Sequence, residues 1–374
     1  MTTRALLIGI NYEGSSCSLK GCVNDILSTK DKLVRIYGYD PKNIVIMEEH
    51  SFDPKLIPTK DNMLTQIKKF VGNKQMNVNA RLTFHFSGHG GGINDFSGDE
   101  DDVKDECIYP LDFTKKDKVY DPKTGRTTSQ LRCITDDDLD LLFDNEFFDQ
   151  TTKVRRIFDC CHSGTMGDQK VNISFANKKT RCVSSSNNNK DVSFFNIRDV
   201  GEVNVTAWDY KENRYRLAKK SDCVERFYNS NEVNYLLYII VNYSSSPVIQ
   251  TFNVVTSSPI TASPNEEATK DIKLSSKQDV IIKIDPHYED KIYDMIDISG
   301  CLDNQESADA FINGKPKGAC TDSLWKVMEK NNYNQTILEL CNNLNIALQN
   351  GGYEQSPKLS LGQYVDVKKT KISF

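Results

Sequence analysis

The sequence lacks any hydrophobic run long enough to cross a membrane. Its longest near-candidate, residues 235–241, is far shorter than the roughly 18 apolar residues that a spanning helix needs. The apolar stretch at residues 5–10 is likewise too short for the hydrophobic core of a signal peptide. These absences predict a soluble, cytoplasmic protein that does not associate with membranes.

The sequence also lacks a strong excess of either charge, and its cysteines lack a metal-type spacing. The 47 Lys and Arg residues against 52 Asp and Glu residues leave a net charge of −5, which excludes a mainly basic nucleic-acid-binding protein. No two of the 11 cysteines have CxxC spacing, which argues against a zinc cage or a thioredoxin-like site. Hydrophobic residues make up 38% of the 374 residues, so the composition excludes wholesale disorder.

Strand-like and helix-like segments alternate over the first 160 residues. A short apolar run predicts a buried strand at residues 4–10, and further strands are expected at 43–47, 80–86 and 153–158. Apolar residues at helical spacing predict helices at residues 23–37, 61–71 and 136–148. This alternation is typical of an α/β fold, in which a mainly parallel sheet lies between helices and the functional site lies beyond the carboxyl ends of the strands.

Residues 169–291 have a different texture, and we expect them to form a long insert that is partly ordered and partly mobile. They contain Ser and Asn runs and no clear helical period, with strand-like pieces at 202–208, 235–243, 248–255 and 279–284. The α/β pattern returns with a strand at 292–298, helices at 318–330 and 333–348, and a strand at 358–361. The sequence thus divides into a catalytic region at 1–168, the insert at 169–291, and a smaller region at 292–374 that completes the same α/β fold.

Two chemically distinctive motifs follow predicted strands. One is Ser-Gly-His-Gly-Gly at 87–91, and the other is Asp-Cys-Cys-His-Ser-Gly at 159–164. A nucleophilic cysteine needs a thiolate, a base and oxyanion donors, and Cys161, His89 and the Gly90 N–H would supply these if the two strands are neighbours. The ordinary alternatives are that His89 is a loop histidine and Cys161 a buried thiol.

The neighbours of Cys161 are rival residues for the same chemistry. Successive residues of an extended segment point to opposite faces. We therefore expect His162 to point away from Cys161 and to be structural, and Cys160 to point into the fold.

These two motifs together resemble the paired signatures of the metacaspases, which are caspase-fold cysteine peptidases that cleave after Arg or Lys. Segments at 21–25, 105–112 and 298–309 support the resemblance, which covers residues 4–168 and about 292–362. It implies a caspase-like fold with His89 as the base and Cys161 as the nucleophile. It also implies that Asp25, Ser87 and Asp159 form an acidic pocket, in which carboxylates would select a cationic side chain. By itself, Asp25 would be read as a charge at a helix start.

An acidic segment raises the question of calcium. Residues 94–106 hold seven acidic residues, but an EF-hand loop starting at Asp95 would have Glu100 where glycine is required, so we reject that motif. The resemblance instead implies a calcium site formed by four aspartates, namely Asp105, Asp136, Asp137 and Asp168. Four convergent carboxylates would repel one another without a cation. Without the resemblance, Asp136 and Asp137 would be read as helix-start charges.

The expected function is that of a calcium-dependent cysteine endopeptidase, a monomer acting on protein or peptide substrates with Arg or Lys at the cleaved bond. Residues 169–226 contain 12 Lys and Arg against 7 Asp and Glu. A basic residue of this segment would occupy the acidic pocket of a zymogen until calcium triggers self-cleavage. The ordinary alternative is a solvated basic loop.

Two other functions remain open at this point. One is a non-catalytic metacaspase-like scaffold or regulator that binds partners through the insert, and the other is a paracaspase-like peptidase. The order of regions, with no prodomain before the first strand and a long insert, resembles type II metacaspases. The segments at 98–102 and 299–309 resemble type I.

Overall fold

A computed structural model gives the structure of the chain. It describes residues 2–94, 104–121, 125–161, 169–175, 280–284, 290–302, 305, 307–312 and 314–374, and the strands at 206–209, 214–217, 223–229, 234–241 and 254–257. At residues 94, 104, 105, 120, 121 and 206–257 the description is confined to secondary structure. The chain forms two compact units, one of Met1–Ser174 with Asp285–Phe374 and the other of Phe175–Ile284. The regions expected at 1–168 and 292–374 therefore share one unit.

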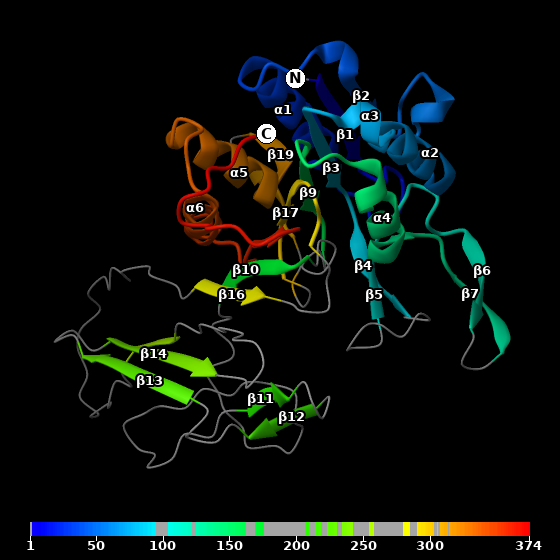
Figure 1. Cartoon of the computed structure of the whole chain (residues 1–374). Coiled ribbons are helices and arrows are strands. Elements are labelled where there is room, and N and C mark those ends of the chain that lie inside the picture. Colours follow the sequence, from blue (N-terminus) through cyan, green and yellow to red (C-terminus); the bar gives the residue numbers. More distant parts are fainter. Residues whose placement is uncertain are drawn as a thin grey trace, which may run out of the picture. The chain divides into compact units, whose positions relative to one another are not determined.

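A single sheet is the centre of the first unit (Figure 1). Its strands in this unit follow the order β10 (Val171–Phe175), β20 (Lys358–Leu361), β17 (Asp294–Ser299), β9 (Lys153–Asp159), β3 (Ala80–Ser87), β1 (Thr2–Gly9) and β2 (Ile44–Met47). The pairs from β17 to β2 are parallel, and β20 is antiparallel to both of its neighbours. This sheet confirms the expected α/β fold.

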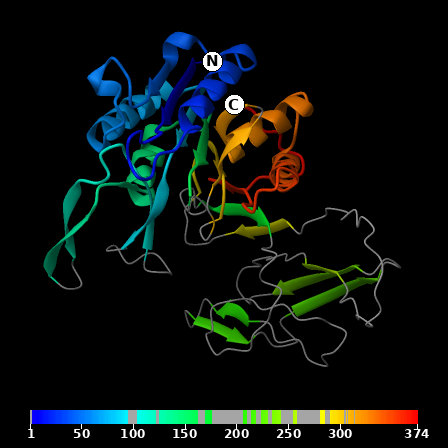
Figure 2. The ribbon, with the colours of Figure 1, turned by 180° about the vertical axis from the view of Figure 1, so that it is seen from behind.

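Helices cover both faces of the sheet, as Figures 1 and 2 show from opposite sides. On one face α1 (Cys22–Arg35) packs against α5 (Ala319–Lys330), which packs against α6 (Ile337–Asn350). On the other face lie α2 (Lys60–Val71), α3 (Lys74–Asn77) and α4 (Asp136–Leu142), and the apolar stripe of α2 joins β1, β3 and β9 in the main core. Short 3₁₀ turns occur at Pro41–Asn43, Pro54–Leu56 and Asn145–Phe147.

The helix α2 illustrates how the sequence sets these elements. Thr59 caps its N-terminus by accepting from the Asn62 N–H, and Gly72 ends it with a φ of 68°, a conformation that glycine adopts at little cost. Asp61 in its first turn and Lys68 near its end complement the helix dipole.

Two helices differ from the sequence expectation for local reasons. The helix expected at 136–148 ends at Leu142, because the Asp144 carboxylate accepts from the Glu146 N–H and starts a separate turn. The helix expected at 333–348 begins at Ile337, because Thr336 and Glu339 form a capping box there.

Three small antiparallel sheets extend the first unit. They are β4 (Gly90–Asn94) with β5 (Lys104–Ile108) and β8 (Ile134–Thr135), β6 (Lys116–Asp121) with β7 (Arg126–Leu131), and β18 (Asp309–Ile312) with β19 (Lys315–Gly318). The second unit contains β11 (Thr206–Asp209), β12 (Arg214–Leu217), β13 (Cys223–Asn229), β14 (Asn234–Val241), β15 (Val254–Ser257) and β16 (Val280–Ile284). β10, which lies within the expected insert, pairs with β20 in the first unit.

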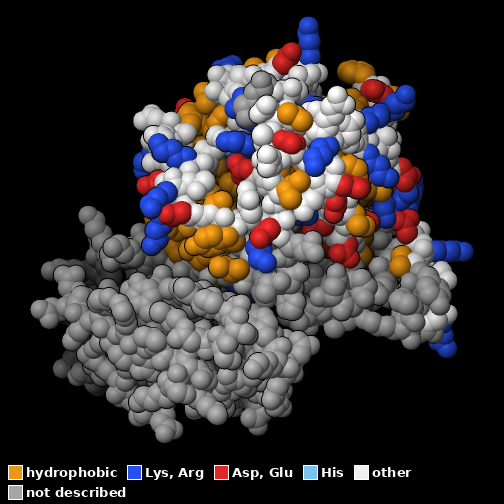
Figure 3. All heavy atoms as spheres, in the orientation of Figure 1, with side chains coloured by type: hydrophobic (Ala, Val, Ile, Leu, Met, Phe, Trp, Pro, Cys, Tyr) orange, Lys and Arg blue, Asp and Glu red, His pale blue; other side chains and the backbone are white. Residues whose placement is uncertain are grey.

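The surface carries no large patch of one charge on the face drawn in Figure 3, where Lys, Arg, Asp and Glu side chains of the described residues are interspersed. Among the residues that the structure describes, no helix is both long enough and apolar enough to span a membrane.

Candidate active site

The two motifs lie at the carboxyl ends of neighbouring central strands. Ser87 at the end of β3 pairs in register with Asp159 at the end of β9. His89 and Cys161 each follow two residues later, and both line one cavity of about 170 Å³. The cavity is also lined by Leu19, Cys22, Ser87, Gly88, Asp159, Ser307, Ala308, Asp309 and Gly318. The topology thus brings together residues from both ends of the sequence.

His89 is held by two contacts, and one of them shows which ring nitrogen carries the proton. Its Nε2 lies 2.6 Å from the carbonyl oxygen of Cys17, and its ring lies 4.7 Å from that of Tyr12. Because a carbonyl only accepts hydrogen bonds, Nε2 must carry the proton of the neutral ring. Nδ1 is then the nitrogen that can take a proton from a substrate or a thiol.

The backbone around His89 is held by the Tyr12 hydroxyl. That hydroxyl accepts from the His89 N–H (3.0 Å) and donates to the Tyr109 carbonyl (2.6 Å), while the Tyr109 N–H donates to the His89 carbonyl (3.0 Å). Hydrogen-bonded and non-hydrogen-bonded pairs alternate in an antiparallel ladder. His89 and Tyr109 form a hydrogen-bonded pair, so the next pair, Gly90 with Ile108, is a non-hydrogen-bonded pair. The Gly90 N–H therefore points away from β5.

The two adjacent cysteines have different surroundings. Cys161 is partly exposed, and its Sγ lies 3.9 Å from the Ser307 carbonyl oxygen. Cys160 is 1% exposed, and burial raises the pKa of its thiol well above the usual range. Cys160 therefore stays a protonated core thiol. His162 lies outside the described residues.

Gly90 must be a glycine because the backbone after β9 passes close to it. A Cβ at Gly90 would lie 2.3 Å from the Cys161 carbonyl oxygen and 3.1 Å from the Cys160 Sγ. The motif glycine therefore allows the two strand ends to approach each other.

The two pocket carboxylates meet at the N-terminus of α5. Asp25 in the first turn of α1 accepts from the Gly318 N–H and the Ser87 hydroxyl, both at 2.9 Å. Asp159 accepts from the Thr321 N–H (2.8 Å) and from the Ser307 hydroxyl (2.5 Å). The first N–H groups of a helix lack partners within the helix, so these carboxylates satisfy the start of α5.

Burial disfavours the charged form of both pocket carboxylates. Burial raises the pKa of Asp25 well above the usual range, and the neighbouring Asp159 raises it further, while the hydrogen bonds from Gly318 and Ser87 oppose the shift. Burial also raises the pKa of Asp159, against the hydrogen bonds from Ser307 and Thr321. A positively charged group between the two carboxylates would relieve both effects.

Several pocket residues were not assigned a role from the sequence. Ser307 and Asp309 lie in the segment at 298–309 that supported the family resemblance, but no pattern pointed to their side chains. Asp309 accepts from the Lys20 N–H (2.7 Å) and lines the cavity. No sequence pattern pointed to Tyr12 or Cys17. Cys17 contributes its backbone carbonyl, a group that every residue has.

The expected calcium ligands are only partly described. Asp168 and the side chain of Asp105 lie outside the described residues. Asp136 and Asp137 are the first residues of α4, which directly follows β8. β8 pairs with β5, and β5 carries Asp105. The topology thus brings the chain at 105 alongside the chain at 136–137.

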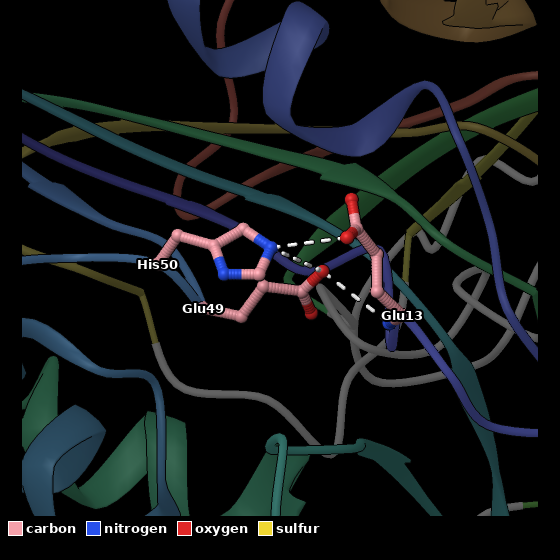
Figure 4. A group of neighbouring side chains, drawn as sticks. All are labelled: Glu13, Glu49 and His50. Atoms are coloured by element: carbon pink, nitrogen blue, oxygen red, sulfur yellow. Dashed lines mark hydrogen bonds and ion pairs between the residues drawn. The ribbon is translucent and has the colours of Figure 1, made fainter.

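A second group of ionisable residues lies at the turn that follows Tyr12 (Figure 4). The His50 Nε2 lies 3.0 Å from a Glu13 carboxylate oxygen, and Glu49 accepts from the N–H groups of Tyr12 (2.8 Å) and Glu13 (3.3 Å). Through these hydrogen bonds, Glu49 contacts the backbone of the turn that follows Tyr12, and His50 contacts Glu13.

Comparison with known proteins gives a consistent result. A family model described as "Metacaspase, peptidase C14 domain" matches residues 3–170. Metacaspase-1 of Yarrowia lipolytica is 30% identical over 366 residues, which are 97% of this chain and 62% of that protein. Metacaspase-1 of Meyerozyma guilliermondii is 32% identical over 357 residues (96% of this chain, 68% of the relative), and that of Kluyveromyces lactis is 30% identical over 371 residues (99% and 68%). The chain thus spans about two thirds of the length of these relatives.

Proposed function

Because this chain belongs to the metacaspase family of C14 peptidases, we propose that it is a calcium-dependent cysteine endopeptidase that cleaves after Arg or Lys. The observation that carries the proposal is the single cavity lined by Cys161, His89 and the pocket carboxylate Asp159. A nucleophile, a base and a cation-selective pocket share that cavity. This is the combination that such an activity requires.

The catalytic steps follow from the groups around the cavity. The His89 Nδ1 takes the proton of the Cys161 thiol, and the thiolate attacks the carbonyl carbon of the peptide bond while the Gly90 N–H donates to the oxyanion that forms. His89 then protonates the leaving amine from Nδ1, and a thioester with the N-terminal part of the substrate remains on Cys161. Water attacks the thioester while Nδ1 accepts its proton, and the acid is released. The Cys161 thiolate then takes this proton back from Nδ1, which returns the thiol. The Cys17 carbonyl keeps the imidazole oriented throughout.

Specificity for Arg or Lys rests on the buried carboxylates. Asp25 and Asp159 are 1% and 5% exposed, and no Lys or Arg of the described chain forms an ion pair with either. A guanidinium or ammonium group entering the cavity would gain charge-assisted hydrogen bonds where water is largely excluded. Asp309 would add a further negative charge at the rim.

Calcium fits the donor chemistry of the second proposed site. Asp105, Asp136, Asp137 and Asp168 offer only hard carboxylate oxygens, which calcium prefers. A bound calcium ion would offset the repulsion among these carboxylates. The ion would also tie β5, whose neighbour β4 begins at Gly90, to the start of α4.

Activation by self-cleavage in the insert is the remaining part of the proposal. The support is the basic excess of residues 169–226 in a chain that carries an acidic pocket. That segment lies mostly outside the described residues, so the cleavage site is to be found by N-terminal sequencing of fragments after calcium addition. Intact chains with full activity would contradict this part.

The decisive experiment measures cleavage of fluorogenic peptides that end in Arg, Lys or Asp, with calcium or with a chelator. The wild-type chain should cleave the Arg and Lys peptides only with calcium, and Cys161→Ala should abolish turnover. Cleavage that is independent of calcium would contradict the proposed ion, and cleavage after Asp would contradict the pocket. The absence of turnover under every condition, also after deletion within 176–279, would contradict the enzymatic function.

A further inference from the structure

A buried histidine, His85, lies beneath the pocket on β3. It precedes Ser87 by two residues, so both side chains point to the sheet face that α1 and α5 cover. His85 is completely buried, and burial lowers its pKa to about 3, so the imidazole is neutral at physiological pH. The catalytic steps described above do not use it.

Thr321 connects His85 to the pocket. The His85 Nε2 lies 3.2 Å from the Thr321 hydroxyl oxygen. The Thr321 N–H donates to Asp159 at 2.8 Å, and this hydrogen bond lowers the pKa of the carboxylate against the effect of burial. A chain of hydrogen bonds thus runs from His85 through the first turn of α5 to Asp159.

Which group donates in each of these hydrogen bonds follows from the protons that each group carries. A hydroxyl has one proton, and an ionised carboxylate can only accept. In the contact between the His85 Nε2 and the Thr321 hydroxyl, either group can donate, depending on which nitrogen of the imidazole carries the proton. The His85 Nδ1 has no hydrogen-bond partner among the described residues. A buried acceptor without a partner is tolerated more readily than a buried N–H without one. This favours the tautomer with the proton on Nε2, which then donates to the Thr321 hydroxyl.

We propose that His85 is a positioning residue for the substrate pocket: its Nε2–H donates to the Thr321 hydroxyl and so holds the first turn of α5, from which the Thr321 N–H donates to Asp159. The effect is to hold that carboxylate ionised and aimed at the cavity, where a cationic side chain would bind. The inference rests on the proposed Arg and Lys specificity, and it names a residue that supports that specificity without touching the substrate.

The first test is independent of activity. Nitrogen-15 NMR of histidine-labelled, full-length protein reports which nitrogen of each neutral imidazole carries the proton, and His85→Gln identifies the His85 signals by their loss. We expect Nε2 to be protonated, and its shift to change in Thr321→Val. A proton on Nδ1, or an unchanged Nε2 shift in Thr321→Val, would overturn the proposal.

The second test uses steady-state kinetics with Arg and Lys peptides. His85→Leu removes the donor, so KM should rise about fivefold while kcat stays within about twofold, as expected for the loss of one hydrogen bond to a binding group. His85→Gln keeps an amide donor near the Nε2 position and should restore most of the wild-type KM. The double variant His85→Leu/Thr321→Val should be no worse than Thr321→Val alone, because both changes break the same chain.

A matched control comes from the same strand. Thr83 lies two residues before His85 on the same face, is also fully buried, and bonds to the Tyr39 hydroxyl (2.9 Å), away from the pocket. Thr83→Val should lower stability by a similar amount with KM unchanged. A rise in KM for Thr83→Val equal to that for His85→Leu would overturn the positioning role. Failure of wild-type turnover would instead contradict the proposed function, and the NMR result would still decide the proton arrangement.

Discussion

Gly318→Ala tests the pocket directly, because this glycine lies between the two carboxylates. A Cβ at Gly318 would lie 2.3 Å from an Asp159 oxygen and 2.6 Å from an Asp25 oxygen. The backbone itself accepts alanine, since φ is −69° and ψ is 132°. Any effect of the substitution therefore comes from the collision with the carboxylates.

The carboxylates cannot move aside without losing hydrogen bonds. Asp159 is held by Ser307 and Thr321, and Asp25 by Ser87 and by Gly318 itself. Overpacking of this kind costs about 1–3 kcal/mol, whereas Gly→Ala at a permitted backbone conformation returns about 0.4–1 kcal/mol. We expect a net loss of unfolding free energy of about 1–2 kcal/mol, measured by urea denaturation.

The effect on activity should be larger than the effect on stability. The added methyl group occupies the space that the substrate cation needs, so kcat/KM for Arg and Lys peptides should fall by at least about tenfold, which corresponds to about 1.4 kcal/mol. Gly351→Ala is the control: its Cβ would meet the Tyr353 ring at 2.5 Å, at the end of α6 and outside the cavity. A folded Gly318→Ala protein with wild-type kcat/KM would refute the pocket assignment.

Further predictions concern the pocket, the cysteines and calcium. Asp159→Ala should severely weaken cleavage of Arg and Lys peptides in a folded chain, and an unchanged preference would count against the pocket. Cys160→Ala should remain active because this thiol is buried, whereas Cys161→Ala should be inactive. Asp168→Ala should raise the calcium concentration needed for half-maximal activity, and a titration identical to wild type would exclude that ligand. Burial and the Asp159 charge raise the Asp25 pKa, so the folded chain holds this proton more tightly than the unfolded chain. That contribution to stability is present at acid pH and is lost as pH rises above the ordinary carboxyl range. Asp25→Asn should therefore reduce the decline of unfolding free energy with rising pH, as measured by urea denaturation across pH.

Local patterns were sufficient to predict the central part of the fold. The strand expected at 80–86 is observed at Ala80–Ser87, and that expected at 153–158 at Lys153–Asp159. β3 alternates apolar and polar residues, which is a strand pattern, and both strands lie buried in the middle of the sheet. Because parallel strands end at the same edge, His89 and Cys161 were expected to share one site if these strands were neighbours, and the structure pairs β3 with β9.

Short hairpins were harder to predict, because they carry too few apolar residues for a clear period. The hairpin of β18 and β19 is an example, since only two of its eight strand residues, Phe311 and Ile312, are large and apolar. Yet this hairpin contributes Asp309 to the rim of the cavity and Gly318 to its wall. Residues 313–314 connect the two strands, and the polar sequence Asn-Gly there is the local signal for a tight turn.

The sequence alone thus determined the motifs, their strands and the edge of the sheet at which they meet, because side-chain identity and periodicity are local properties. The tertiary structure decided how those side chains are held. The Gly318 N–H bonds to Asp25, 293 positions away, and the Thr321 N–H bonds to Asp159, 162 positions away. The proton on His89 is assigned by the carbonyl of Cys17, 72 positions away. Backbone N–H and C=O groups are nearly the same in every residue, so only the packing of distant segments brings the right ones to the site.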